Sequence, residues 1–435
     1  MINTHQVQEL LDFIDASPSP WHAVKSIEGR LQEQRFTKLQ ETDKWQLQTD
    51  GRYYVVRDES SIIMFVVGQK PLAESGYKIV GAHTDSPGLR IKPNAAHAAD
   101  GILRLGVEVY GGPILATFTD RDLSLAGRVS YRLKSSEINT KLIDFKLPLL
   151  RLPNLAIHMN RKVNEEGLKL KKQSELPLIL SVLANEQVPK DYFLNLLQSQ
   201  MDIEMEQILS WELNVYDTQK GVFWGTEKQF YTDSQLDNLA SCHAGLEALI
   251  ANSESHPDST LVCAFFDHEE IGSESVKGAD GSFLPDILER IALSLDTDTE
   301  DYQRALAQSF MISADMAHAY QPNFASAYES EHKVMVNKGP VIKVNANHRY
   351  TSESVSQAHF IDWCYQAGVS YQKYSHHSDI PCGSTIGPMI SAKLGIRTVD
   401  VGCPMWAMHS IRESAGTLDH DDMIKVMKTF FSDKA

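Results

Sequence analysis

The chain has 435 residues, of which 42% are hydrophobic and 23% charged, the composition of an ordinary soluble globular protein. This length is too great for one compact core, so we expect two domains or one domain with a large insertion. Acidic residues outnumber basic ones by 57 to 41, which argues against nucleic acid as a partner, because binding phosphates requires a clustered excess of lysine and arginine.

The cysteines and the N-terminal segment indicate a reducing compartment. The five cysteines are widely spaced and contain no C-x-x-C pair, so neither disulfides nor a thiolate zinc site is expected. Residues 1–17 have the spacing of an amphipathic helix and lack the basic and apolar regions of a secretory signal. No segment approaches the roughly eighteen apolar residues that cross a bilayer. We therefore expect a cytoplasmic protein that does not enter membranes.

Helical and strand-like patterns are mixed over residues 1–91, which is typical of an α/β sheet. The predicted elements are helices over residues 1–17 and 21–32 and strands over residues 53–56, 62–67 and 77–81. The last of these strands runs directly into His83 and Asp85.

Residues 92–231 differ from the rest and predict a β-rich inserted domain. Short alternating stretches such as 103–110 and 127–133 dominate this segment, Gly111-Gly112-Pro113 forms a turn, and helical periodicity is scarce. From residue 232 to the end, strands and helices alternate again. The predicted elements there are a long helix from Gln235, strands over 261–266, 311–314 and 398–401, helices over 284–295 and 418–431, and an acidic solvated loop over 296–301.

Carboxylates and imidazoles follow predicted strands, or begin helices, in five short segments. These are residues 81–87, 236–238, 267–272, 313–318 and 405–410. Open α/β sheets place ligands at the carboxyl ends of their strands. A mixture of imidazole and carboxylate suits divalent metals such as zinc. Two metals that share one bridging carboxylate need about five such ligands, which these segments can supply.

Each residue in these segments also has a structural interpretation. His83 fits a buried histidine held by Asp85, although residues two apart on a strand face the same side, so Asp85 can also orient a metal-bound His83. Asp237 fits a helix N-cap, and Asp315 fits a turn residue. His409 lies among apolar and sulfur-containing residues, where most histidines belong to the core.

The pair Glu269–Glu270 is harder to explain structurally. It closely follows the apolar run 261–266, where burial of two adjacent charges is costly without partners. Adjacent carboxylates leaving a strand point in different directions, so one can bind a metal while the other faces a water on that metal.

The motifs of the chain follow, in order, the signature blocks of the aspartyl aminopeptidase family, which the chain resembles along nearly its whole length. The matching blocks are GAHTDSPGLRIKP, the helix start at Asp237-Asn238, FFDHEEIGSES, SADMAHAYQPN, NKGPVIKVN, DIPCGSTIGPM and MHSIRE. The resemblance implies a three-layer α/β/α zinc-peptidase domain, residues 1–91 and 232–435, interrupted by a β-rich dimerisation domain, residues 92–231. It also implies a homo-oligomer in which dimers form a tetrahedral dodecamer.

The implied activity is hydrolysis of the N-terminal residue, preferably Asp or Glu, from peptides with a free N-terminus. Two zinc ions per subunit are expected, for which cobalt or manganese can substitute. The resemblance places one zinc on His83 and Asp315 and the other on Glu270 and His409, with Asp237 bridging them. It also implies a cis peptide bond between Asp237 and Asn238.

The resemblance gives three further residues catalytic roles. Glu269 is implied as the general base and Asp85 as the residue that orients His83. His318 is implied as a donor to the carbonyl oxygen in the transition state, although a core or surface histidine explains it as well.

Substrate contacts are implied outside the metal ligands. Lys343 lies within the apolar run 341–344, either on the solvent face of an edge strand or as a cation for a substrate carboxylate, the role that the resemblance gives it. His158 is implied to reach the active site of a neighbouring subunit, although a lone histidine after an apolar stretch is usually structural. Gly383 and Ser384 are expected to line the substrate pocket.

Two other functions stay open. A related two-metal amide hydrolase, such as a carboxypeptidase or a deacylase, has the same ligands and would hold a substrate carboxylate with an arginine. A catalytically silent assembly protein would keep the fold but be free to lose Glu269 and the five ligands, all of which are present.

Overall fold

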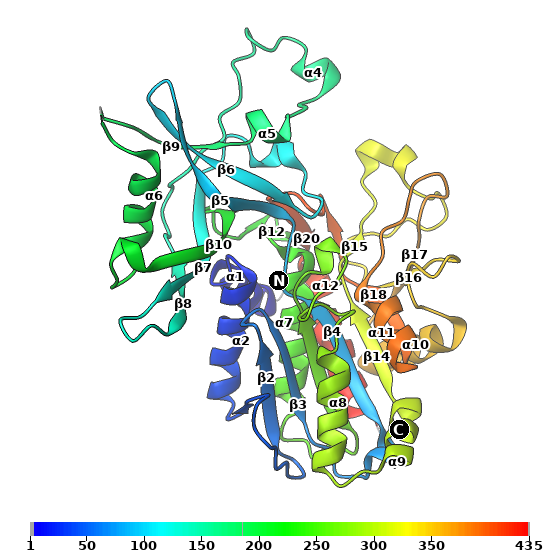
Figure 1. The fold of residues 1–435 in the computed structure, drawn as a ribbon. Coiled ribbons are helices and arrows are strands. Elements are labelled where there is room, and N and C mark those ends of the chain that lie inside the picture. The colour runs from blue at the N-terminus through cyan, green and yellow to red at the C-terminus, as the bar shows by residue number, and fades with distance from the viewer. Residues whose placement is uncertain (1–3, 185, 434–435) are drawn as a thin grey trace.

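The computed structural model describes residues 4–184 and 186–433, so residues 1–3 of the first predicted helix lie outside the described range. Figure 1 shows a large α/β body and, beside it, a separate group of strands formed by β5 to β10. Among the described residues, none of the helices combines the length and apolar character needed to cross a bilayer.

A nine-stranded sheet forms the centre of the α/β body. Its strands, in spatial order, are β1 (Thr37–Leu39), β2 (Arg52–Arg57), β3 (Ser61–Val66), β13 (Thr260–Phe266), β4 (Tyr77–His83), β14 (Phe310–Ala314), β18 (Arg397–Gly402), β16 (Val341–Val344) and β17 (Gln372–Ser375). The central strands β13, β4, β14 and β18 are parallel to their neighbours in this group. Every residue of β4 and β13 is buried, which explains why these strands read as continuous apolar runs.

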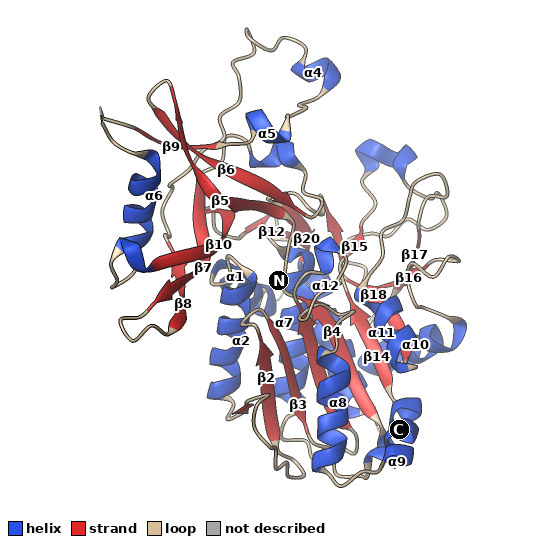
Figure 2. Ribbon diagram, in the orientation of Figure 1, coloured by secondary structure: helices blue, strands red, loops and turns tan. Residues whose placement is uncertain are grey.

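Helices cover both faces of this sheet, which gives the predicted three-layer α/β/α arrangement (Figure 2). One face packs against α1 (His5–Asp15), α2 (Pro20–Glu33), α7 (Leu236–Asn252), α10 (Ser354–Ala367) and α12 (Thr417–Ser432). The other packs against α3 (Leu72–Ser75), α8 (Phe283–Ser294), α9 (Thr299–Gln308) and α11 (Ile386–Leu394). Successive side chains of β4 point to opposite faces of the sheet. Val80 packs with the helices of the first group, and Ile79 packs with those of the second.

A six-stranded antiparallel sheet, here called the inserted sheet, has its own core. Its strands, in spatial order, are β8 (Ile138–Asp144), β7 (Leu123–Arg132), β10 (Ile208–Asp217), β5 (Gly88–Ala99), β6 (Ile102–Tyr110) and β9 (Leu178–Val182). The segment also contains the short helices α4 (Val163–Glu166) and α5 (Lys172–Glu175) and the longer α6 (Pro189–Gln198). Phe193 and Leu197 of α6 pack into the sheet's core. The β-rich insertion therefore also carries a helix.

A third sheet joins the end of the insertion to the C-terminal part of the chain. Its order is β11 (Val222–Trp224), β12 (Phe230–Asp233), β20 (Glu413–Gly416), β19 (Pro404–Trp406) and β15 (Ala317–His318). Strands β11 and β12 pair in this third sheet and not with the inserted sheet. The inserted sheet therefore extends from the start of β5 to the end of β10, residues 88–217. The boundaries 92 and 231 remain a proposal.

Two local predictions concern the acidic stretch and the cysteines. The acidic stretch 296–301 is a loop only at its start, because Asp298 caps α9 by accepting a hydrogen bond from the backbone N–H of Asp301. All five cysteines are free, as predicted, and Cys382 alone among them is not fully buried.

Candidate metal centre

The parallel strands of the central sheet bring three of the predicted site segments to one edge. His83 is the last residue of β4 and pairs with Phe266, the last residue of β13. Glu269 and Glu270 follow β13 in a short turn, and Asp315 directly follows β14. Because parallel strands end at the same edge, side chains that lie far apart in sequence meet here.

Asp237 lies between two imidazoles. Its Oδ1 is 3.4 Å from Nε2 of His83, and its Oδ2 is 3.4 Å from Nε2 of His409. Oδ1 is buried and has no hydrogen-bond partner. The residue is not the N-cap of α7, a position that Gln235 occupies, and the Asp237–Asn238 peptide bond is cis, as expected.

Two further carboxylates complete the cluster. Glu270 Oε1 lies 3.4 Å from Nε2 of His409, and Asp315 Oδ1 lies 3.7 Å from Nε2 of His83. Ligand atoms of His83, Asp237 and Glu270 all lie within 4.8 Å of one another, close enough to hold a metal ion. The structure therefore brings together the five side chains predicted as metal ligands. His409 is 30% exposed and faces carboxylates, so the alternative of a core histidine is wrong.

Asp85 supports the cluster from behind. Its Oδ1 lies 3.4 Å from Nδ1 of His83, whose Nδ1 is also 3.0 Å from the Asp85 backbone oxygen. The same carboxylate accepts the backbone N–H groups of Glu269 and Glu270, at 3.1 Å each. A histidine held at Nδ1 presents Nε2 toward a metal, the usual arrangement behind a metal-bound imidazole.

The electrostatics of the cluster follow from burial and crowding. Burial raises the pKa of the Glu269 carboxyl well above its ordinary value, and the nearby carboxylates of Asp315 and Glu270 add to the effect. Burial likewise raises the pKa of Glu270 to about 7. Such perturbed carboxyl groups are typical of functional sites.

Lys343 is buried at the side of the cluster. Strand β16 lies between β18 and β17, so the edge-strand interpretation of Lys343 is wrong. Its Nζ donates to Asp315 Oδ2 at 3.1 Å and to the backbone oxygen of Met316 at 3.0 Å, and lies 5.2 Å from the centre of the Tyr350 ring. The cation is therefore paired within the protein.

His318 lies next to this cation. Burial, together with the ammonium of Lys343, lowers the pKa of His318 to about 4. Its ring is 5.8 Å from the ring of Tyr374, whose hydroxyl lies 2.5 Å from Nδ1 of His376. An imidazole with this pKa is neutral at pH 7 and retains one N–H to donate.

Three other predicted residues are exposed, and within the described part of one subunit they make no hydrogen bond or ion pair with the metal cluster. His158 is exposed, in a loop outside the inserted sheet. Gly383 and Ser384 are also exposed, and Ser384 Oγ donates to the backbone oxygen of Arg349 at 3.1 Å. The neighbouring Cys382 packs on the small apolar cluster that contains Tyr350 and so approaches Lys343 indirectly. The pocket roles of these residues stay predictions.

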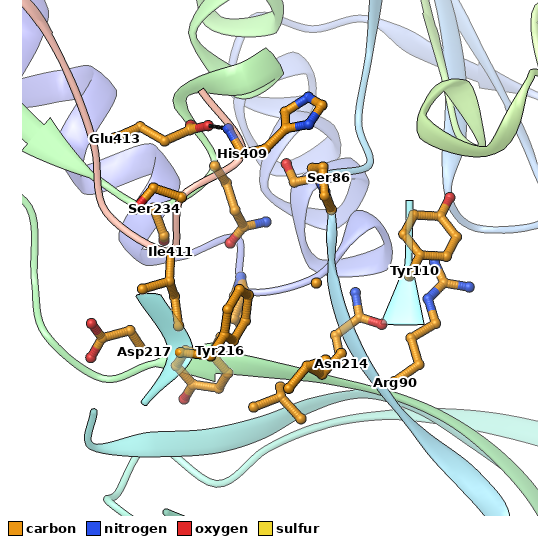
Figure 3. Close-up of a pocket in the computed structure, with 18 residues that line it drawn as sticks. Ser86, Arg90, Tyr110, Asn214, Tyr216, Asp217, Ser234, His409, Ile411 and Glu413 are labelled. Carbon is orange, nitrogen blue, oxygen red and sulfur yellow. Dashed lines mark hydrogen bonds between the residues drawn. The ribbon is translucent and has the colours of Figure 1, made fainter. Parts of the chain in front are cut away.

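Glu413 belongs to the site but was not singled out from the sequence. This buried carboxylate accepts the backbone N–H of Asp237 at 3.0 Å. It also accepts the backbone N–H of His409 at 2.6 Å (Figure 3). His409 has a φ of 68°, an uncommon left-handed conformation that these bonds help to hold. The only signal in the sequence was its place at the end of the MHSIRE block.

A cavity separates this part of the cluster from the inserted sheet (Figure 3). His409 and Glu413 line one side, and Arg90, Tyr110 and Asn214 of the inserted sheet line the other. The cavity therefore lies between the metal cluster and the inserted sheet of the same subunit.

Comparison with known proteins gives one consistent family. The family described as aminopeptidase I zinc metalloprotease (M18) matches residues 13–431. A probable M18 family aminopeptidase 2 of Stutzerimonas stutzeri (strain A1501) is 46% identical over 429 residues, 98% of this chain and 97% of that one. A protein of the same description from Clostridium acetobutylicum is 45% identical over 427 residues, 98% of each chain.

Solved structures agree with this result. A chain in the cryo-EM structure of the Ape4 and Nbr1 complex is 37% identical, with a TM-score of 0.95, over 98% of this chain and 85% of that one. A chain of the S. cerevesiae mApe1 dodecamer is 27% identical, with a TM-score of 0.86, over 99% of this chain and 97% of that one. Both likenesses span the catalytic body and the inserted sheet.

Proposed function

This chain belongs to the M18 family and is a zinc-dependent aminopeptidase, and we propose that it removes N-terminal Asp or Glu from peptides by means of two zinc ions and a glutamate base. The observation that carries the proposal is the Asp237 carboxylate, which has one oxygen facing each of two imidazoles. One zinc would lie on His83 and Asp315, the other on Glu270 and His409, and Asp237 would bridge them.

The donor set fits zinc, and its size allows two ions. The buried Oδ1 of Asp237 makes no hydrogen bond and lies 3.4 Å from Nε2 of His83, so a cation between the two would stabilise the carboxylate. Two metals that share one bridging carboxylate need about five ligands. The cluster supplies that number with His83, Asp237, Glu270, Asp315 and His409.

The residues around the metals divide the chemistry between them. When bound, zinc polarises the scissile carbonyl and lowers the pKa of a water molecule toward about 7. Glu269 would take the proton from that water and deliver it to the leaving amine, as a general base does. His318, neutral at pH 7, would donate a hydrogen bond to the carbonyl oxygen. Asp85 would keep His83 oriented throughout.

Lys343 is the proposed determinant of the acidic preference. An ammonium has three N–H groups, and the contacts to Asp315 and Met316 account for two. The third is available for the side-chain carboxylate of a substrate Asp or Glu. Gly383 and Ser384 would line the same pocket, on the far side of Tyr350.

We also propose a homo-oligomer in the cytoplasm. One of the similar structures is the mApe1 dodecamer, and a tetrahedral dodecamer of dimers is the corresponding proposal here. The loop that carries His158 exposes Leu155, Ile157 and Met159, of which Met159 is 76% exposed. A second subunit would cover these apolar side chains, and His158 would then reach the neighbour's active site. Five free cysteines favour a reducing compartment.

The test is hydrolysis of aminoacyl-p-nitroanilides of Asp, Glu, Leu, Lys and Ala by protein stripped with a chelator and then given zinc, cobalt or manganese. Metal-restored cleavage that favours Asp and Glu supports the proposal. A preference for Leu or Lys would support the aminopeptidase activity but contradict the proposed preference for acidic residues. Cleavage of N-acyl amino acids instead would favour the deacylase alternative.

A further inference from the structure

The inserted sheet reaches the metal centre through one turn. Strand β6 ends at Tyr110, and the chain then passes beside the proposed metal ligands. Residues 110–114 are called the β6 turn. The hydroxyl of Tyr110 donates to Asp85 Oδ2 at 2.7 Å. Asp85 is the carboxylate that holds His83 and the backbone N–H groups of Glu269 and Glu270. A residue of the inserted sheet thus completes the hydrogen bonding behind a proposed zinc ligand.

The same turn holds a second proposed ligand. His409 Nδ1 lies 3.1 Å from the backbone oxygen of Gly112, and the backbone N–H of Ile114 donates to the His409 oxygen at 2.9 Å. A carbonyl can only accept, so the proton of a neutral His409 must be on Nδ1. This leaves the lone pair of Nε2 facing Asp237 and Glu270, the tautomer that a metal requires.

A third ligand is in close contact with the turn. Gly111 has a φ of 64°, and a Cβ built on it would lie 3.1 Å from Cβ and 3.2 Å from the backbone oxygen of Glu270. Only glycine avoids both the left-handed strain and this crowding. The turn is therefore packed against the backbone that carries Glu270.

Cation–ring contacts hold the turn in place. The guanidinium of Arg90 lies 3.7 Å from the centre of the Tyr110 ring, on the side of the inserted sheet (Figure 3). Arg90 and Arg128 of this sheet also approach the ring of Trp21 on α2, at 5.8 and 5.2 Å. Arg128 is further paired with Asp58 at 3.0 Å. The inserted sheet is thus anchored to the catalytic body at the point where the β6 turn enters it.

We propose that the β6 turn is a positioning element through which the inserted sheet sets the affinity and geometry of the metal centre, with Tyr110 as its main positioning residue. The inference rests on the proposed zinc ligands. It gives the inserted sheet a role inside its own subunit, separate from any contact between subunits.

The experiment measures zinc affinity of metal-stripped protein by competition with a chromophoric chelator, alongside kcat, KM and the melting temperature. Tyr110→Phe removes only the hydroxyl. Its matched control is Tyr216→Phe, because Tyr216 lies in the same sheet and donates a 2.5 Å hydrogen bond to Asp144 Oδ1 instead. A second pair is Gly111→Ala against Gly101→Ala, since Gly101 also has a positive φ, at 77°, but open space around it.

We expect Tyr110→Phe and Gly111→Ala to lose about 10- to 100-fold in zinc affinity or kcat, the usual effect of changing a group behind a metal ligand. KM should stay within about threefold, and both controls should bind zinc as the unaltered protein does. Equal zinc affinity and kcat in Tyr110→Phe and the unaltered protein would overturn the inference, as would equal losses in both tyrosine variants. Failure of the unaltered protein to bind zinc would instead overturn the proposed metal centre.

Discussion

Lys343 and Asp315 form a buried ion pair with 3.1 Å between Nζ and Oδ2. The cation proposed to select the substrate therefore contacts a proposed zinc ligand directly. Substrate recognition and metal binding share the carboxylate of Asp315, so a change at Lys343 should affect both. Comparing an acidic with a neutral substrate separates the loss of recognition from an effect on the metal.

Replacing Lys343 with methionine should weaken acidic substrates most. Loss of a buried charge pair costs about 2 kcal/mol or more, so kcat/KM for an Asp substrate should fall on the order of 30-fold. An Ala substrate, which makes no such pair, should lose much less. Steady-state kinetics on both substrates measure the difference, with the exposed Lys373→Met as control. Equal losses on Asp and Ala substrates would contradict a role in selection.

Replacing Glu269 with glutamine should stop catalysis and leave the metals bound. Removing a general base typically costs about 10² to 10⁴ in rate, and glutamine has nearly the same shape but takes no proton. Zinc content and kcat should be measured together, with the exposed Glu274→Gln as control. If Glu269→Gln lost its zinc, Glu269 would be a ligand; if its kcat stayed within tenfold, another group would be the base.

Mixed oligomers test whether His158 serves the neighbouring subunit. His158→Ala and Glu269→Gln should each be inactive alone. Co-expressed in equal amounts as tagged chains, they should form mixed dimers in which one site has an intact Glu269 and receives an intact His158 from its partner. Random pairing would restore about a quarter of the sites. No recovery in purified mixed dimers would show that His158 does not act between subunits.

A pair of buried histidines predicts lower stability in mild acid. His243 Nδ1 lies 2.9 Å from His420 Nε2, between α7 and α12, and both rings are fully buried. Burial lowers the pKa of His420 to about 4, and burial and the neighbouring His420 ring lower the pKa of His243. The unfolded chain, with ordinary values near 6.5, then binds more protons than the folded one, so stability falls as the pH drops from 6.5 toward 4.

Urea unfolding of metal-free protein at pH 7.5 and pH 5 measures this effect. The histidine pair contributes a loss of roughly 1–3 kcal/mol between the two, which is read as the difference in pH dependence between the unaltered protein and His420→Asn. His420→Asn should be less stable at pH 7.5 but should lose less on acidification, whereas the exposed His359→Asn should behave as the unaltered protein does. An unchanged pH dependence in His420→Asn would contradict the assignment.

Much of the fold was predictable because its central strands are buried on both faces. Strands such as β13 appear in the sequence as continuous apolar runs, which can be recognised without knowing the neighbouring strands. Several site segments follow such runs directly. Helix α6 was missed because its segment lies among short alternating strands, and only Phe193 and Leu197 of it are buried. Three of the proposed ligands, His83, Glu270 and Asp315, were predictable because each stands at or just after the end of such a strand, and Asp237 because it stands at a helix start.

The contacts behind the ligands were not predictable from one sequence. Glu413 accepts the backbone N–H of Asp237, and Tyr110 donates to Asp85, both across more than 20 residues of sequence, and no local pattern reveals such partners. The ion pair of Lys343 with Asp315 likewise depends on how β16 and β14 lie in the sheet. Sequence patterns gave the residue types, whereas the pairing required the three-dimensional arrangement.

Asp237 is the residue that would bridge two zinc ions, because its carboxylate faces both imidazoles. The number of bound ions is measured by titrating metal-stripped protein with zinc, followed by competition with a chromophoric chelator and by metal analysis after desalting. A centre bridged by Asp237 binds two equivalents per subunit in the unaltered protein, and Asp237→Asn should lose the tight binding of both. One equivalent in the unaltered protein, or two tightly bound in Asp237→Asn, would contradict a centre bridged by Asp237.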